Sequence, residues 1–123
     1  MKLRIRGNSL RLRLTRGEVT TMRADGEVGE RIEFPDGAAL GYRLQARGDA
    51  DAIRAELRES AITVVVPTAD IRRWADTDAV SLQADVGLTG GESLRVLIEK
   101  DFACLADRPD EDDSDAFPHP EAD

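Results

Sequence analysis

The chain has 123 residues and a mass of 13.5 kDa, which is the size of one domain, and its hydrophobic residues, 41% of the total, suffice for one modest core. No apolar run approaches the length of a membrane span, and the chain starts with an alternating segment instead of a charged and then apolar leader. Its single cysteine, Cys104, cannot form an internal disulfide, which agrees with a reducing compartment. We therefore predict a cytoplasmic protein without a membrane partner.

The formal net charge of -8 is unevenly distributed. Residues 1–100 contain 16 Lys and Arg against 16 Asp and Glu, whereas residues 101–123 contain nine acids against Arg108 alone. The body of the chain is therefore neutral, and the C-terminal segment holds the whole excess of acid.

The segments KLRIR and SLRLRLT alternate apolar and basic residues, which is typical of strands with one buried face. Gly7-Asn8 lies between them and suits a two-residue hairpin turn. Thr15 and Glu18 then form the capping box of a short helix, whose apolar face contains Val19 and Met22. The predicted order so far is strand, strand, helix.

EVGERIEF and ALGYRLQAR follow as a second hairpin around Pro35-Asp36-Gly37, so the first half of the chain reads β-β-α-β-β. An offset of 52 residues places the apolar positions of this half on those of the second half, from Leu12 on Val64 and Met22 on Trp74 to Tyr42 on Leu94. This pattern predicts internal repeats at residues 2–48 and 54–100.

The repeat decides how residues 53–60 are interpreted, since their composition would also suit a helix. The offset places Ala55 and Leu57 on the first strand, so we predict a strand there. Thr68 is expected to cap a second helix that packs Ile71 and Trp74 against the sheet.

Eight strands and two short helices predict an α+β fold with an eight-stranded antiparallel sheet, closed or nearly closed into a barrel, and two halves related by a pseudo-twofold axis. We expect a single domain over residues 1–105 and an acidic, proline-punctuated tail over residues 106–123.

The basic face of the first hairpin is the candidate site for an anionic ligand or a protein partner. With a two-residue turn, Arg4 lies opposite Arg11 and Lys2 opposite Arg13, and facing like charges destabilise a sheet unless an anion lies beside them. A solvated surface neutralised by neighbouring acids is the competing interpretation. The predicted site residues are Lys2, Arg4, Arg6, Arg11 and Arg13.

The tail offers apolar anchors in Phe102, Leu105 and Phe117, which we expect to hold it against the body with its acids near the basic hairpin. Its Asp and Glu residues and His119 match neither a closed zinc site nor an EF-hand loop, so we predict no metal site and no cofactor. The lone His and Cys lack a third orienting group, and no catalytic residues are assigned. The few aromatic residues argue against nucleic acid as the partner.

The start MKLRIRGNSLRLRLTRGEV, the segment EKDFACL and the ending DEDDSDAFPHP resemble a family of small uncharacterised bacterial proteins over nearly the whole chain. That family has no established activity, so the resemblance implies no catalytic residue. It does imply that the tail is an integral part of the protein.

Two functional hypotheses follow. The first is a non-enzymatic binding or regulatory module that uses the basic hairpin face and the acidic tail. The second is a small enzyme or carrier for a phosphorylated ligand, with the five basic residues facing into a barrel, as similar basic alternation does in triphosphate tunnel enzymes. The two hypotheses differ in which face of the first hairpin is buried.

Overall fold

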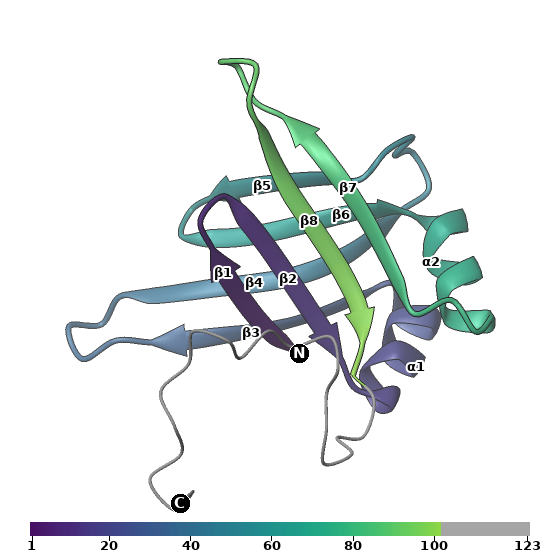
Figure 1. Ribbon diagram of the computed structural model, residues 1–123. Coiled ribbons are helices and arrows are strands. Elements are labelled where there is room, and N and C mark those ends of the chain that lie inside the picture. The colour runs from purple at the N-terminus through teal and green to yellow at the C-terminus, as the bar shows by residue number, and fades with distance from the viewer. Residues whose placement is uncertain (102–123) are drawn as a thin grey trace, which may run out of the picture.

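The structure is a computed structural model that describes residues 1–101, and it contains two four-stranded sheets with two helices at one end (Figure 1). In chain order the elements are β1 (Lys2–Arg6), β2 (Ser9–Leu14), α1 (Arg16–Asp25), β3 (Glu27–Glu33), β4 (Ala39–Arg47), β5 (Arg54–Arg58), β6 (Ala61–Pro67), α2 (Thr68–Asp76), β7 (Ser81–Gly87) and β8 (Ser93–Lys100). The order β-β-α-β-β therefore occurs twice. The predicted boundary of the domain at residue 105 lies outside the described residues.

The predicted antiparallel barrel is wrong. Sheet A has the strand order β1-β2-β8-β7 and sheet B the order β3-β4-β6-β5, and within residues 1–101 neither sheet closes. Each sheet combines the first hairpin of one half with the second hairpin of the other half, and the strands that join the two hairpins, β2 with β8 and β4 with β6, run parallel. Alternation shows which face of a strand is buried, but it does not show which strand lies alongside, so the sequence could not predict this pairing.

The two halves correspond with one change of offset. Leu3 pairs with Leu12 in β1 and β2, and Ala55 pairs with Val64 in β5 and β6, which keeps the offset of 52 residues. For the second hairpins the offset is 54 residues, because Leu10 lies beside Val96 whereas its equivalent Ile62 lies beside Tyr42. The expected match of Tyr42 with Leu94 is therefore wrong.

The extra residues lie in the connection from α2 to β7, which is longer than the single Gly26 between α1 and β3. Two residues are an even number, so the inward and outward alternation of the following strands is unchanged. A comparison of the two halves without a gap therefore predicts correctly which side chains point inward, but it matches the residues of the second hairpins to the wrong equivalents.

Residues 53–60 do not form a helix. Arg54–Arg58 form β5, as predicted, and pair with β6 across a turn in which Glu59 and Ser60 have φ angles of 52° and 62°. Positive φ at both central residues matches the right-handed twist of a two-residue hairpin.

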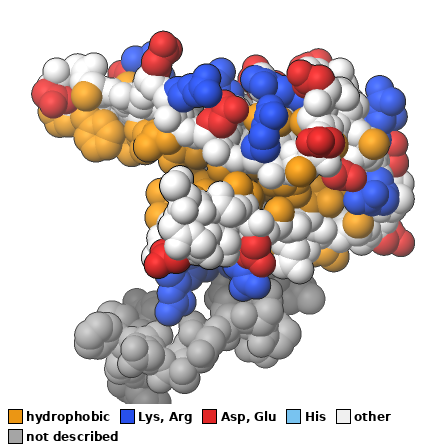
Figure 2. Space-filling view, turned by 90° about the horizontal axis from the view of Figure 1, so that it is seen from above, with side chains coloured by type: hydrophobic (Ala, Val, Ile, Leu, Met, Phe, Trp, Pro, Cys, Tyr) orange, Lys and Arg blue, Asp and Glu red, His pale blue; other side chains and the backbone are white. Residues whose placement is uncertain are grey.

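The core lies between the two sheets, and the two helices lie at one end of it (Figure 1); hydrophobic side chains are visible between the two layers in Figure 2. Met22 of α1 and Ile71 and Trp74 of α2 are buried, as predicted. The Thr15–Glu18 capping box of α1 is present, whereas the predicted Thr68 cap of α2 is wrong. Pro67 holds the N-cap position there without a side-chain hydrogen bond, and Thr68 is already the first helical residue.

Replacing Trp74 with Ala should lower the free energy of unfolding by about 3 to 5 kcal/mol, because the indole is fully buried. Trp74→Phe should cost less, since it keeps much of the ring and loses mainly the 3.0 Å hydrogen bond from Nε1 to the Val80 carbonyl oxygen. Urea denaturation measures both. A loss below 1 kcal/mol for Trp74→Ala would contradict the packing described.

Candidate functional site

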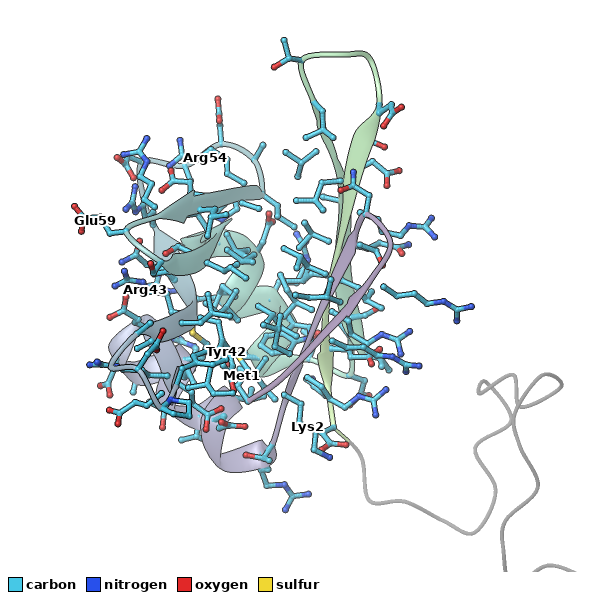
Figure 3. The ribbon with its side chains drawn as sticks, turned by 90° about the vertical axis from the view of Figure 1, so that its left-hand side faces the viewer. Met1, Lys2, Tyr42, Arg43, Arg54 and Glu59 are labelled. Carbon is cyan, nitrogen blue, oxygen red and sulfur yellow. The ribbon has the colours of Figure 1, made fainter. Side chains whose placement is uncertain are left out.

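The five predicted basic residues lie together on the outer face of sheet A. Leu10, Leu12 and Leu14 point into the core, so the intervening side chains of β2 point to solvent, as do those at the alternate positions of β1. Figure 3 shows nitrogen-tipped side chains projecting from this outer face, with Lys2 near the end where the chain leaves sheet A. We call this surface, made by Lys2, Arg4, Arg6, Arg11 and Arg13, the basic face.

The facing pairs of the hairpin are those expected. Lys2 lies opposite Arg13, Arg4 opposite Arg11 and Arg6 opposite Ser9. Like charges therefore face each other in two successive outward pairs, which destabilises the hairpin by a few tenths of a kcal/mol per pair unless a counter-charge is near.

One acid on β8 and another just after it neutralise one side of the basic face. Glu99 Oε1 is 2.8 Å from Arg13 Nη2 and 3.5 Å from Arg11 Nε, because β8 lies beside β2 and places Glu99 next to Arg13. Just after β8, Asp101 lies 3.5 Å from Lys2. The competing interpretation of the sequence, neutralisation by neighbouring strands, accounts for these three cations.

Neutralisation by neighbouring strands does not account for Arg4 and Arg6. Both are exposed, and within residues 1–101 neither forms an ion pair. They lie on β1, the edge strand of sheet A, where no further strand of the described chain can supply an acid. The uncompensated charge of the basic face is therefore concentrated at this edge.

The equivalent hairpin of sheet B, made by β5 and β6, carries fewer cations on its outer face. At the positions that match Arg4, Arg11 and Arg13, it has Glu56, Thr63 and Val65. Only the positions equivalent to Lys2 and Arg6 keep a cation, as Arg54 and Arg58. The charge distribution thus distinguishes two surfaces that have the same backbone arrangement.

A second polar site, which the sequence analysis missed, surrounds the backbone amine of Met1. This amine forms ion pairs with Glu18 of α1 and with Glu30 of β3, the latter at 2.8 Å, and the side chain of Met1 is fully buried. The Tyr42 hydroxyl group is 3.5 Å from both the Met1 carbonyl oxygen and Glu30 (Figure 3). We call these four residues the amino-terminal cluster.

The charges of the cluster support one another. Burial works to lower the pKa of the Met1 amine, but the hydrogen bonds and negative charges of Glu18 and Glu30 outweigh it and raise that pKa above its ordinary value. Burial likewise works to raise the pKa of Glu18, yet hydrogen bonds from the amine and from Thr15 lower it. Burial and the charge of Glu30 raise the pKa of Tyr42.

The second half of the chain fills the equivalent place with apolar side chains. Ile53, Ala84 and Val96 correspond to Met1, Glu30 and Tyr42, and only Asp70 retains the acid of Glu18. One signal in the sequence could have revealed the cluster, since Glu30 interrupts the inward apolar alternation of β3 between Val28 and Ile32.

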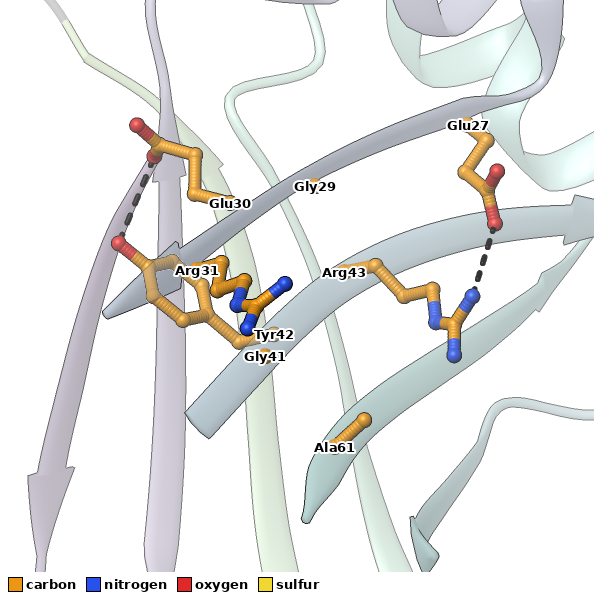
Figure 4. A pocket seen from close by; sticks show the side chains of 8 residues that line it. All are labelled: Glu27, Gly29, Glu30, Arg31, Gly41, Tyr42, Arg43 and Ala61. Atoms are coloured by element: carbon orange, nitrogen blue, oxygen red, sulfur yellow. Dashed lines mark hydrogen bonds and ion pairs between the residues drawn. The ribbon is translucent and has the colours of Figure 1, made fainter. Parts of the chain in front are cut away.

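A shallow depression of about 420 Å³ lies on the outer face of sheet B (Figure 4). Gly29, Gly41 and Ala61 leave its floor almost without side chains, and a Cβ atom added at Gly29 would come within 3.0 Å of the Cβ atom of Arg43. Arg43 and Glu27 form a 3.8 Å ion pair along one side. The depression is open and its charges are paired, so it lacks features of a catalytic site.

The tail anchors predicted from the sequence, Phe102, Leu105 and Phe117, lie outside the described residues, as do His119 and the acids of the tail. Over the part of the chain that is described, no group of three or more His, Cys, Asp or Glu side chains could hold a metal ion. No helix in that part combines the length and the apolar character needed to cross a membrane.

Comparison with known proteins places the chain in a family. A family of unknown function, DUF7009, matches residues 1–121. The chain belongs to the DUF7009 family. No curated protein matches this DUF7009 chain, and no solved structure does either. The resemblance to a family without established activity is thus confirmed, and it covers the acidic tail.

The amino-terminal cluster also determines how stability depends on pH. The pKa of the Met1 amine is raised, so its contribution is complete below the unfolded-state pKa of about 8 and is lost as pH rises through the higher folded-state pKa. The pKa of Glu18 is lowered, so its contribution is complete above the unfolded-state pKa of about 4.3 and is lost as pH falls through the lower folded-state pKa.

Glu18→Gln should therefore lower the free energy of unfolding by about 1 to 3 kcal/mol near pH 7, as expected for a hydrogen bond to a charged group, and should reduce the loss of stability at both ends of the pH range. Denaturant unfolding between pH 3 and pH 10 measures this. The matched control is Asp70→Asn, since Asp70 holds the equivalent position in α2 but, within residues 1–101, pairs only with the exposed Arg73 at 3.2 Å. Equal losses for the two variants would contradict a special role of the cluster.

Proposed function

We propose that this DUF7009 protein is a non-enzymatic binding module whose basic face takes an anionic partner. The observation that carries the proposal is the pair of exposed cations, Arg4 and Arg6, at the free edge of sheet A without an acid of the described chain beside them. An anion at this edge would remove the repulsion between Arg4 and Arg11, which lie opposite each other.

The residue type supports the proposal. The guanidinium group is planar and donates hydrogen bonds in a fork that matches a carboxylate or phosphate group, whereas a merely soluble surface has no need of this geometry. Four of the five cations of the basic face are Arg. Three of their five equivalents in sheet B, Glu56, Thr63 and Val65, carry no positive charge, and Thr63 and Val65 are buried.

The shape of the surface favours an extended partner over a small molecule. The basic face is the outer side of an open sheet, and each exposed ion pair contributes only about 0 to 1 kcal/mol, so several contacts are needed for useful affinity. An acidic polypeptide can make them in series. Trp74 is buried and Tyr42 packs against the core, so within residues 1–101 Phe34 is the one exposed aromatic side chain, which leaves little for stacking on bases and argues against nucleic acid.

The competing hypothesis, a small enzyme or carrier for a phosphorylated ligand, requires the basic residues to line the inside of a barrel. Leu10, Leu12 and Leu14 occupy the inward positions instead, and the basic residues point outward. The arrangement therefore favours the binding module.

Charge reversal at the edge, Arg4→Glu with Arg6→Glu, should weaken binding of poly-L-glutamate, and added salt should weaken binding by the unmodified protein, because exposed charges are screened over about 8 Å at physiological ionic strength. Binding is measured by titration at two salt concentrations. The control is Arg54→Glu with Arg58→Glu on β5, which changes the net charge by the same amount on the equivalent strand of sheet B. If both double variants lose binding equally, net charge rather than the basic face is responsible and the proposal is wrong.

A further inference from the structure

Four of the six large hydrophobic side chains that are exposed within residues 1–101 form two equivalent sets. Ile5 on β1 is 58% exposed and its equivalent on β5, Leu57, is 71% exposed. Phe34 beyond β3 is 49% exposed and its equivalent beyond β7, Leu88, is 43% exposed. Since both sets occupy the same place in the fold, the exposure arises from the architecture and not from a single irregular residue.

The architecture explains this exposure. The β3–β4 hairpin projects past the edge of sheet A, and the β7–β8 hairpin projects past the edge of sheet B. Met1 contacts Glu30 and Tyr42, which marks the point where the start of β1 crosses β3 and β4. The β3–β4 hairpin continues beyond that point, past the free edge of β1 (Figure 1). In Figure 2 it forms an arm whose apolar underside is uncovered by the layer opposite, and Ile32, 49% exposed, lies on that inward side with Phe34.

We define the first slot as the space bounded by the free edge of β1 and the inward side of this arm, and the second slot as its equivalent at β5 and the β7–β8 hairpin. The two slots differ in charge. The outward residues of β1 are Lys2, Arg4 and Arg6, which are all cations. At the equivalent positions β5 has two arginines with Glu56 between them. A chain segment that is both acidic and apolar therefore fits the first slot better than the second.

Residues 102–123 have this composition, with an acidic run at residues 110–115 followed by Phe117. The segment also starts in the right place, because Asp101 lies 3.5 Å from Lys2 and its backbone N–H donates to the Leu14 carbonyl oxygen at 2.7 Å. From there an extended chain covers about 3.3 Å per residue, so the 16 residues up to Phe117 can span the five residues of β1 several times over.

We infer that the acidic C-terminal segment of this chain occupies the first slot, with the acids of residues 110–115 beside Arg4 and Arg6 and the Phe117 ring against Ile32 and Phe34. This inference names the occupant of the basic face and so rests on the proposed function. The segment then competes with any external acidic partner. If it occupies the slot nine-tenths of the time, the apparent affinity for the partner falls about tenfold.

A spin label at residue 116 tests the position of the segment in the full chain. Ala116→Cys with Cys104→Ser provides one labelling site, and the label broadens the amide resonances of nearby residues. We expect stronger broadening at Ile32 and Phe34 than at their equivalents in the second slot, and Phe34→Ser should reduce it whereas Leu88→Ser should not. Equal broadening at both slots, or none, would overturn the inference. Broadening that appears only when labelled and unlabelled chains are mixed would assign the slot to a second copy, and would overturn it too.

Binding of poly-L-glutamate separates this inference from the proposed function. Truncation after Arg108 should increase the affinity about tenfold, and Phe117→Ala should increase it in part. If the truncated and full-length chains bind equally well, the segment does not compete and the inference fails while the proposed function stands. If neither binds, the proposed function fails, and the spin label alone decides where the segment lies.

Discussion

The parallel pairing of β2 with β8 and of β4 with β6 is the constraint on which the rest of the structure depends. Each pair joins strands from different halves of the chain, so neither half can complete a sheet or cover its apolar face alone. The core consequently forms only when both halves are present, and Met22 and Trp74 pack into a common interior. Contacts between strands this far apart in sequence also predict slow folding, since the cost of closing the long loop comes before most of the stabilising contacts.

The amino-terminal cluster and its apolar counterpart fill the same place in the two halves of the chain with different chemistry. Where β1 crosses sheet B, the first half pairs the partly buried Met1 amine with Glu18 and Glu30, whereas the second half has the apolar residues Ile53 and Ala84 at the positions of Met1 and Glu30. A partly buried ion pair costs desolvation, and here the hydrogen bonds and opposite charges outweigh that cost, since the pKa of the Met1 amine is raised. The paired charges connect the start of β1 to α1 and β3, at one end of the edge strand that carries Arg4 and Arg6.

Much of the local structure could be predicted from residue pattern, and much of the pairing could not. Alternation in SLRLRL gave the buried face of β2, and the capping box gave the start of α1. The basic face could also be predicted, since it depends only on strand period and a two-residue turn. Parallel pairing and the change of offset after α2 leave that alternation intact, so they have no signature in one sequence. The pairing of Glu30 with the Met1 amine joins groups that are distant in the chain and was equally inaccessible.

Because the two halves exchange hairpins, the connection between β4 and β5 contributes little to holding the halves together. Residues 48–52 link the halves without belonging to either sheet, while every strand that crosses from half to half is held by backbone hydrogen bonds and buried side chains. A single β-β-α-β-β unit could make the same contacts with a second copy of itself, which is the arrangement of a domain-swapped homodimer. Such a dimer would carry the same residues on both free edges, whereas the single chain has Arg4 on β1 and Glu56 at the equivalent place on β5, so the two slots can differ in the partner that they accept.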